Sequence, residues 1–310
     1  MDHVTLLSLS SGQADGVKTG SSGTSTDKSA EPAPRLTAEH LRVPVLRCRD
    51  ALRQAGAQVS TETAHSDQEI DAALDGPGRV IVAVETVGQL RAVLRRLVRR
   101  YAPAPSSRPT DLPADRTLPD LPPIGVLPLA GLGAWLGVPT DPAVTAAAVL
   151  GGRTQRLDLL RNDAGSVTLD GVLLGGADTQ GRAVRYGARV EVDDVVLTNG
   201  RDPLLAITVA NADGYAAFDG LPLVIAPSAR DGVLDVAIAL PVQRRRLLGR
   251  RFGRPGAEGE VEVEVRRARG RAVSVTPAVE VPFLDDGVAG RLARKRTWWM
   301  ERASWAVYVP

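Results

Sequence analysis

The segment from Ile81 to Gln89 has residue types that suit phosphate chemistry. The continuous Val/Ile run at 79–84 is typical of a strand covered on both faces. From Gln89 onward, apolar residues recur with the period of a helix. A strand that feeds a loop and then a helix is the usual setting of a phosphate-binding loop, where backbone N–H groups hold the phosphates. Residues 85–88 would form that loop.

Basic residues next to apolar and aromatic ones form a second candidate site. One basic segment, with a helical period at 242–253, contains Arg245, Arg246, Arg250 and Arg251, and a second basic segment runs into Trp298 and Trp299. Such combinations suit an anionic membrane surface, where each basic residue contributes about 1 kcal/mol. A solvated arginine face, with the tryptophans anchoring the last strand, explains the same pattern. Both interpretations stay open. Polybasic contact with nucleic acid is disfavoured, because aromatic residues make up only 4% of the chain.

Composition limits the class of protein. A chain of 310 residues can form two domains, and a formal net charge of +2 gives no reason to expect wholesale nucleic-acid binding. Cys48 is the only cysteine, which excludes an intrachain disulfide and fits a reducing compartment. The apolar stretch at 4–9 is too short for a signal peptide, and no run approaches the ~20 residues of a membrane span. We therefore expect a cytoplasmic protein, which the membrane interpretation would place at the inner membrane face.

The order of elements predicts an α/β domain followed by a β domain. Over residues 1–150, apolar runs alternate with helical patterns, which indicates a parallel sheet. Within that domain, 13–36 and 101–123 read as flexible loops. Over 151–310, short Val/Leu-rich runs are separated by Gly, Asn and Asp, as in a β-sandwich. The last strand is a candidate for rejoining the first domain.

Several strings, in order along the chain, resemble the bacterial diacylglycerol kinase family. Residues 81–90 resemble its strand followed by Gly-Gly-Asp-Gly-Thr-Leu, of which Gly88 and Leu90 remain. Residues 124–134 resemble the strand and Gly-Thr-Gly-Asn-Asp motif, and Ser11-Gly12 retains part of an Asn-Pro-x-Ser-Gly turn. In the β half, the resemblance rests on 209–214, 225–236 and Asp286-Gly287-Val288, which stands where the family has Asp-Gly-Glu.

This resemblance implies a three-layer α/β kinase-like domain, a β-sandwich, and a cleft between them where ATP, Mg²⁺ and lipid meet. It places the nucleotide-binding positions at Ser11, Gly12, Glu85, Val87, Gly88, Gly131 and Gly133. Because Val288 replaces the family's acidic base, Asp286 would have to act in its place, with a shifted backbone. Asp231 matches the family's structural Mg²⁺ position, although Asp231-Gly232 is equally a hairpin-turn signal.

The substitutions indicate a degenerate nucleotide site. A carboxylate at Glu85 would oppose phosphate by roughly 4 kcal/mol at ~4 Å and an effective dielectric of ~20. Val87 replaces an aspartate and cannot bind a proton or a metal. We therefore expect a non-catalytic homologue, without cofactor, that binds a lipid, a membrane surface or a protein. The alternatives are an active ATP- and Mg²⁺-dependent kinase of a diacylglycerol-like hydroxyl, and a regulatory subunit of an active paralogue.

Overall fold

The computed structural model describes residues 2–9, 38–103, 109–110, 112–132, 134–177, 183–218, 220–242 and 262–310. The chain divides into two compact units. Unit 1 comprises Met1–Leu157 and Ala303–Pro310, and unit 2 comprises Asp158–Arg302. The loop predicted at 13–36 and, from residue 243, the helix predicted at 242–253 lie outside the described residues.

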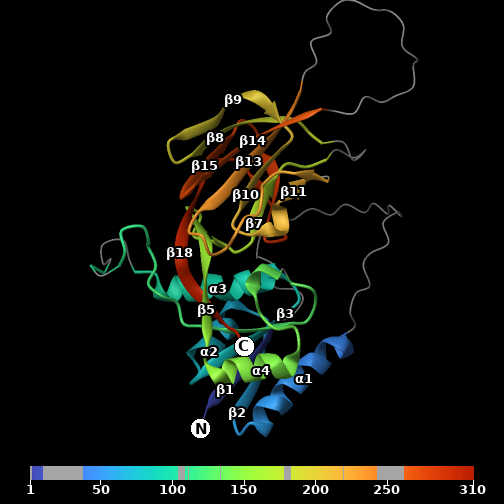
Figure 1. Cartoon of the computed structure of the whole chain (residues 1–310), viewed down its shortest axis with the longest axis vertical. Coiled ribbons are helices and arrows are strands. Elements are labelled where there is room, and N and C mark those ends of the chain that lie inside the picture. Colours follow the sequence, from blue (N-terminus) through green and yellow to red (C-terminus); the bar gives the residue numbers. More distant parts are fainter. Residues whose placement is uncertain are drawn as a thin grey trace, which may run out of the picture. The chain divides into compact units, whose positions relative to one another are not determined.

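Unit 1 is built on a parallel sheet with the strand order β2-β1-β3-β4 (Figure 1). Its strands are β1 (His3–Leu9), β2 (Gln58–Ala64), β3 (Arg79–Val84) and β4 (Gly125–Pro128), and its helices are α1 (Ala38–Gln54), α2 (Asp67–Asp75), α3 (Val87–Tyr101) and α4 (Pro142–Gly151). The α/β alternation predicted for the N-terminal half is confirmed.

The helices cover both faces of this sheet. Cys48 of α1 and Val149 of α4 pack in one apolar cluster with Leu6, Ile81 and Leu127 of the strands. Successive strand residues point to opposite faces. The neighbouring residues Val80, Val82 and Val126, which are also buried, therefore face the other side, where α2 and α3 pack together. Unit 1 is thus a three-layer α/β unit.

Local signals in the sequence set the ends of two helices. The Ser66 side chain accepts a hydrogen bond from the Glu69 N–H at 3.2 Å and caps α2. Asp141 caps α4 and Pro142 occupies its first turn. Pro44, where we expected an interruption, lies inside a continuous α1.

The segment 112–123 is not the exposed excursion that the sequence predicts. Leu118 and Leu121 are fully or almost fully buried. The Leu121 N–H donates to the Ser304 carbonyl at 2.8 Å, and the Ile124 N–H donates to the Ala306 carbonyl at 3.0 Å. Leucines spaced within a proline-rich stretch therefore attach it to the C-terminal strand, which returns to unit 1.

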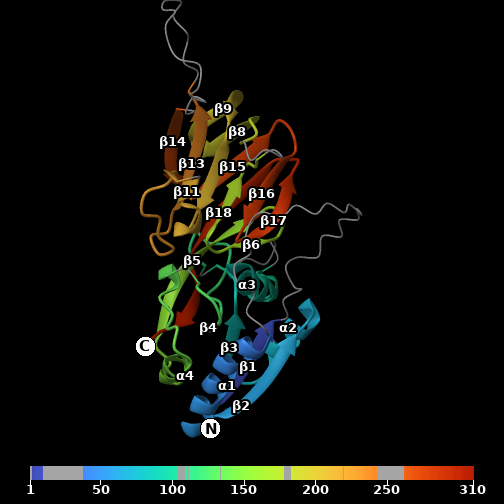
Figure 2. The same cartoon turned by 90° about the vertical axis from the view of Figure 1, so that its right-hand side faces the viewer.

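Unit 2 is a β-sandwich of two antiparallel sheets (Figure 2). One sheet has the order β14-β13-β10-β7-β16-β17 and the other β6-β5-β18-β15-β8-β9. Side chains of both sheets, including Val172, Ile238, Val190 and Trp298, form the core between them. The strands are β5 (Thr154–Asn162), β6 (Val167–Thr168), β7 (Gly171–Leu174), β8 (Tyr186–Val192), β9 (Val195–Leu204), β10 (Ala206–Ala210), β13 (Leu234–Pro241), β14 (Val263–Gly270), β15 (Ala272–Pro277), β16 (Val281–Asp285), β17 (Val288–Leu292) and β18 (Arg296–Tyr308), with a small hairpin of β11 (Ala217–Phe218) and β12 (Leu221–Pro222).

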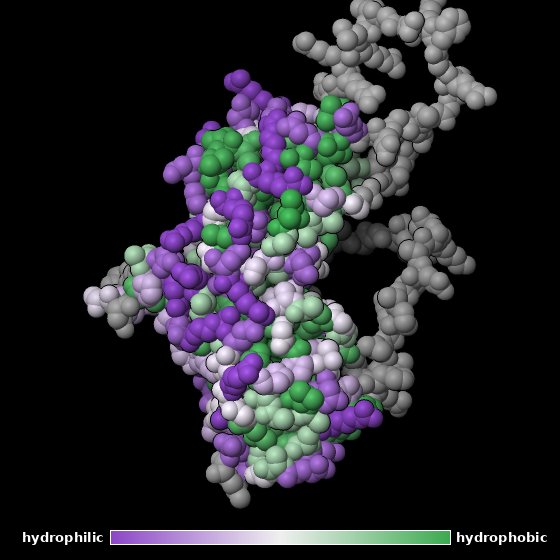
Figure 3. Space-filling view, in the orientation of Figure 1, coloured by the Kyte–Doolittle hydropathy of each residue, from purple (hydrophilic) through white to green (hydrophobic). Residues whose placement is uncertain are grey.

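Two surface features complete the description. Among the described residues, no helix is long and apolar enough to cross a membrane. The outer side of α4 is apolar, because Ala143, Val144 and Ala147 are exposed. This side is visible as a green area in the lower part of Figure 3.

Candidate functional site

The turn between β3 and α3 is short and capped by its own side chains. Only Glu85 and Thr86 separate the strand from the helix. Thr86 is the N-cap of α3, and its hydroxyl accepts a hydrogen bond from the Gln89 N–H at 3.2 Å. The Gln89 side-chain carbonyl in turn accepts one from the Glu85 N–H at 2.7 Å. These two residues form a variant of the capping box, a pattern that Thr86-x-x-Gln89 signals in the sequence but that the loop interpretation missed.

The cap changes what the end of α3 can bind. A helix N-terminus binds phosphate because its first N–H groups lack partners within the helix. Here the Gln89 and Glu85 N–H groups already donate to side chains of the turn itself. Helix α3 begins at Val87, two residues before the predicted start, so Val87 and the buried Gly88 lie in its first turn. The predicted loop at 85–88 is therefore wrong as to its form.

The second motif lies beside the first at the carboxyl edge of the sheet. The Leu129 N–H donates to the Val84 carbonyl at 2.8 Å, so the chain leaving β4 runs next to the end of β3. Gly131 is exposed, and a Cβ added there would meet nothing within 4 Å. None of residues 85–88 or 129–132 is basic. Ser11, Gly12 and Gly133 lie outside the described residues.

Asp286 crosslinks unit 2. It lies in the turn between β16 and β17 with φ of 52° and is 4% exposed. One carboxylate oxygen accepts the Leu169 N–H at 2.8 Å, and the other accepts the N–H groups of Asp170 at 2.8 Å and Gly171 at 3.2 Å. A general base needs a free lone pair within reach of its substrate. These contacts argue against the catalytic role expected for Asp286.

Asp170 is the titratable group with the most altered surroundings near that crosslink. Its carboxylate is 8% exposed and accepts the Gly214 N–H at 2.8 Å. Burial raises the pKa of Asp170 to about 6, with a smaller contribution from the charge of Asp213. Burial likewise raises the pKa of the neighbouring Tyr215 hydroxyl to about 12. The sequence gave no signal for either residue.

Asp170→Asn tests this environment. A carboxyl whose pKa is higher in the folded than in the unfolded state binds more protons when folded, so its contribution to stability falls as pH rises from about 4 to about 6. The neutral variant lacks this loss. We expect the difference in unfolding free energy, variant minus wild type, to increase by about 2 kcal/mol between pH 4 and pH 7. Urea unfolding at a series of pH values measures it. A difference that stays constant with pH would contradict the raised pKa.

Asp231 lies in a bend that leads into β13. Gly232 has φ of 75°, and the Asp231 carboxylate accepts the Val233 N–H at 3.2 Å and pairs with Arg269. Arg269 also contacts the buried Asp235 at 3.0 Å. Among the residues that the structure describes, no group of three or more His, Cys, Asp and Glu could hold a metal ion. The Mg²⁺ role of Asp231 stays a prediction.

The tryptophans do not form the predicted membrane surface. Trp298 is 1% exposed and belongs to the core of unit 2, so its ring cannot reach lipid. Trp299 is partly buried, donates its indole N–H to Glu301 at 2.9 Å, and lies under Arg161 with 5.5 Å from the guanidinium carbon to the ring centroid. Both anchor β18, as the alternative interpretation had it. Arg245, Arg246, Arg250 and Arg251 lie outside the described residues.

The arrangement of a parallel α/β unit, a β-sandwich and a returning last strand recurs in solved structures. A diacylglycerol kinase from Bacillus anthracis str. Sterne superposes with a TM-score of 0.58 at 11% identity, over 100% of this chain and 97% of that one. The chain has the diacylglycerol kinase fold. Another structure from the same organism, provisionally described as a diacylglycerol kinase, gives a TM-score of 0.60 at 12% identity with the same coverage. No protein-family model and no curated protein matches the sequence.

Proposed function

We propose that this chain is a homologue of the diacylglycerol kinases that no longer transfers phosphate and instead binds a lipid or a protein partner. The observation that carries the proposal is the capped first turn of α3. In a kinase of this fold, that turn would have to offer its N–H groups to the nucleotide. In this chain Thr86 and Gln89 occupy two of those groups.

The charges around the turn support the same conclusion. Glu85 brings a carboxylate to the place where the phosphates would lie, and neither 85–88 nor 129–132 contributes a cation. Repulsion between two such charges is several kcal/mol unless a cation offsets it. The residues present do not fit a triphosphate with its Mg²⁺.

An active lipid kinase is the main alternative, and it requires a general base. Asp286 is the candidate for that base, but three backbone N–H groups already donate to its carboxylate. The exposed apolar side of α4 favours a protein partner, which includes the case of a regulatory subunit of an active paralogue. Co-purification with a paralogue tests that case, and co-sedimentation with anionic and neutral liposomes tests the lipid.

We expect ATP with Mg²⁺ to leave the melting temperature unchanged into the millimolar range. A ligand at 100 times its Kd would stabilise the folded state by about 2.7 kcal/mol, so a thermal melt detects even weak binding. The matched positive control is the triple variant Glu85→Gly, Thr86→Gly, Val87→Asp, which removes the cap and the opposing charge. A Mg²⁺-dependent rise in the wild-type melting temperature would contradict the proposal and favour the active kinase.

A further inference from the structure

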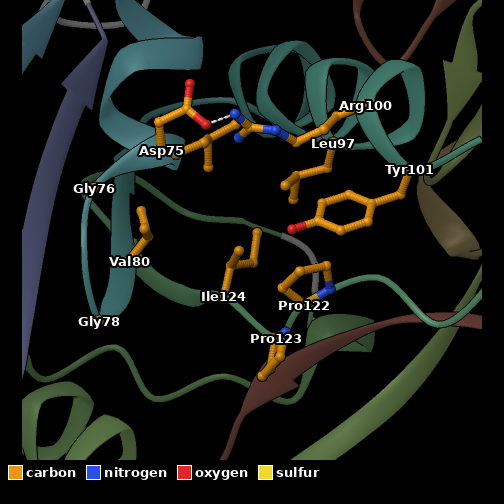
Figure 4. Close-up of a pocket in the computed structure, with 11 residues that line it drawn as sticks. Asp75, Gly76, Gly78, Val80, Leu97, Arg100, Tyr101, Pro122, Pro123 and Ile124 are labelled. Atoms are coloured by element: carbon orange, nitrogen blue, oxygen red, sulfur yellow. Dashed lines mark ion pairs between the residues drawn. The ribbon is translucent and has the colours of Figure 1, made fainter.

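A pocket in unit 1 lies at the opposite edge of the sheet from the turn described above. It has a volume of about 350 Å³ and opens between the end of α2, the end of α3 and the segments that enter β3 and β4 (Figure 4). Ligand sites of parallel sheets usually lie beyond the carboxyl ends of the strands. This pocket lies at the amino ends, so it is separate from the nucleotide-site counterpart.

The walls of the pocket are fixed and largely apolar. Val80, Leu97 and Ile124 form its base and are almost fully buried. Pro122 and Pro123 form another wall, and proline offers no N–H donor. Gly78 holds the backbone so close to β1 that it leaves no space for a side chain. The cavity therefore accepts an apolar group without rearrangement of the backbone.

Polar groups gather at one side of this pocket. Figure 4 shows the Tyr101 hydroxyl directed toward the middle of the cavity and the Arg100 guanidinium paired with the Asp75 carboxylate. The two partners are not held equally. Arg100 lies in the last turn of α3, where the helix dipole favours a cation. Asp75 is the last residue of α2, where the dipole disfavours an anion, and its side chain is 60% exposed.

This asymmetry makes Asp75 the exchangeable partner. An exposed ion pair contributes little to stability, because water solvates the separated charges well. A carboxylate that arrives attached to an apolar chain gains burial of the chain as well as the charge–charge contact. Asp75 can then turn outward into solvent while Arg100 stays in place.

We propose that this pocket binds an amphiphilic carboxylate. Its apolar chain lies against Val80, Leu97 and Ile124, and its carboxylate replaces that of Asp75 at Arg100. The Tyr101 hydroxyl donates a second hydrogen bond. The site is independent of the proposed loss of phosphoryl transfer, because none of its residues lies in the β3–α3 turn.

The test titrates the full chain with octanoate and follows the methyl NMR signals of Val80, Leu97 and Ile124. Octanol and octylammonium serve as probes with the same chain and a different head group. We expect Arg100→Gln to weaken octanoate binding about tenfold, and Asp75→Asn to strengthen it several-fold because the competing carboxylate is gone. Arg99→Gln is the matched control, since Arg99 is 51% exposed and does not line the pocket.

Three results would overturn the proposal. Octanoate could fail to move these methyl signals, octanol or octylammonium could bind as tightly as octanoate, or affinity could be the same in the Arg100→Gln and Arg99→Gln variants. Asp75→Asn keeps the test decisive if Arg100→Gln does not fold, because only a bound anion gains affinity when that carboxylate is neutralised. Unchanged or weaker octanoate binding to Asp75→Asn would likewise reject the exchange.

Discussion

Asp286→Ala is expected to destabilise unit 2 by about 4 kcal/mol, because it leaves three backbone N–H groups without their acceptor. Each buried donor that loses its partner costs about 1–3 kcal/mol, and the three lie on consecutive residues. Hydrogen exchange should show the loss of protection first at the amides of Leu169, Asp170 and Gly171. Chemical denaturation of the whole chain gives the free energy.

Two variants control this experiment. Asp194→Ala removes an exposed carboxylate in the same unit and should change stability by less than about 0.5 kcal/mol. Asp286→Asn keeps one acceptor oxygen and tolerates the positive φ, so we expect an intermediate loss. If Asp286→Ala leaves the stability of unit 2 unchanged, the carboxylate is not the crosslink that its contacts indicate.

Gly78→Ala is expected to destabilise unit 1 by about 4 kcal/mol or to prevent its folding. Gly78 has φ of 93°, and a Cβ built on it would lie 2.0 Å from the carbonyl oxygen of His3. That oxygen belongs to the backbone of β1, which cannot move without breaking its pairing with β2 and β3. Thermal and denaturant unfolding measure the effect.

Gly56→Ala separates the two causes of that cost. Gly56 has a similar φ of 85°, but nothing lies within 4 Å of a Cβ placed there. The backbone conformation alone should cost about 1–2 kcal/mol. Equal losses in the Gly56→Ala and Gly78→Ala variants would show that the close approach to β1 contributes nothing.

Elements with a strong local cause could be predicted from the sequence. The run at 79–84 became β3, the Ser66 and Asp141 caps begin their helices, and the alternation of elements gave the parallel sheet. The errors arose where contacts distant in sequence decide the structure. The segment 112–123 looked like an exposed loop because its partner, the backbone at 304–306, lies almost two hundred residues later. Pro44 looked like a break, but α1 continues through it.

The site was less accessible to prediction. The substitutions at Glu85 and Val87 were visible, yet the two-residue turn and its cap depend on where α3 begins. Asp286 looked like a displaced base because its motif lies near the end of the sequence. Its three partners lie 115 to 117 residues earlier and share no sequence signal with it. The pocket at Arg100 and Tyr101 needs three separate segments to meet, which no local pattern encodes.

The return of the chain to unit 1 has a consequence for biosynthesis. Tyr308 lies in the apolar cluster of unit 1, next to residues of β1, β3 and α4, and Ala306 and Tyr308 bond to Ile124. These C-terminal residues leave the ribosome only after all of unit 2 has been translated. Domains generally fold as units during synthesis, in the order in which they are completed. Unit 2 is therefore the first to have its whole sequence available, and unit 1, although it is translated first, completes its core last.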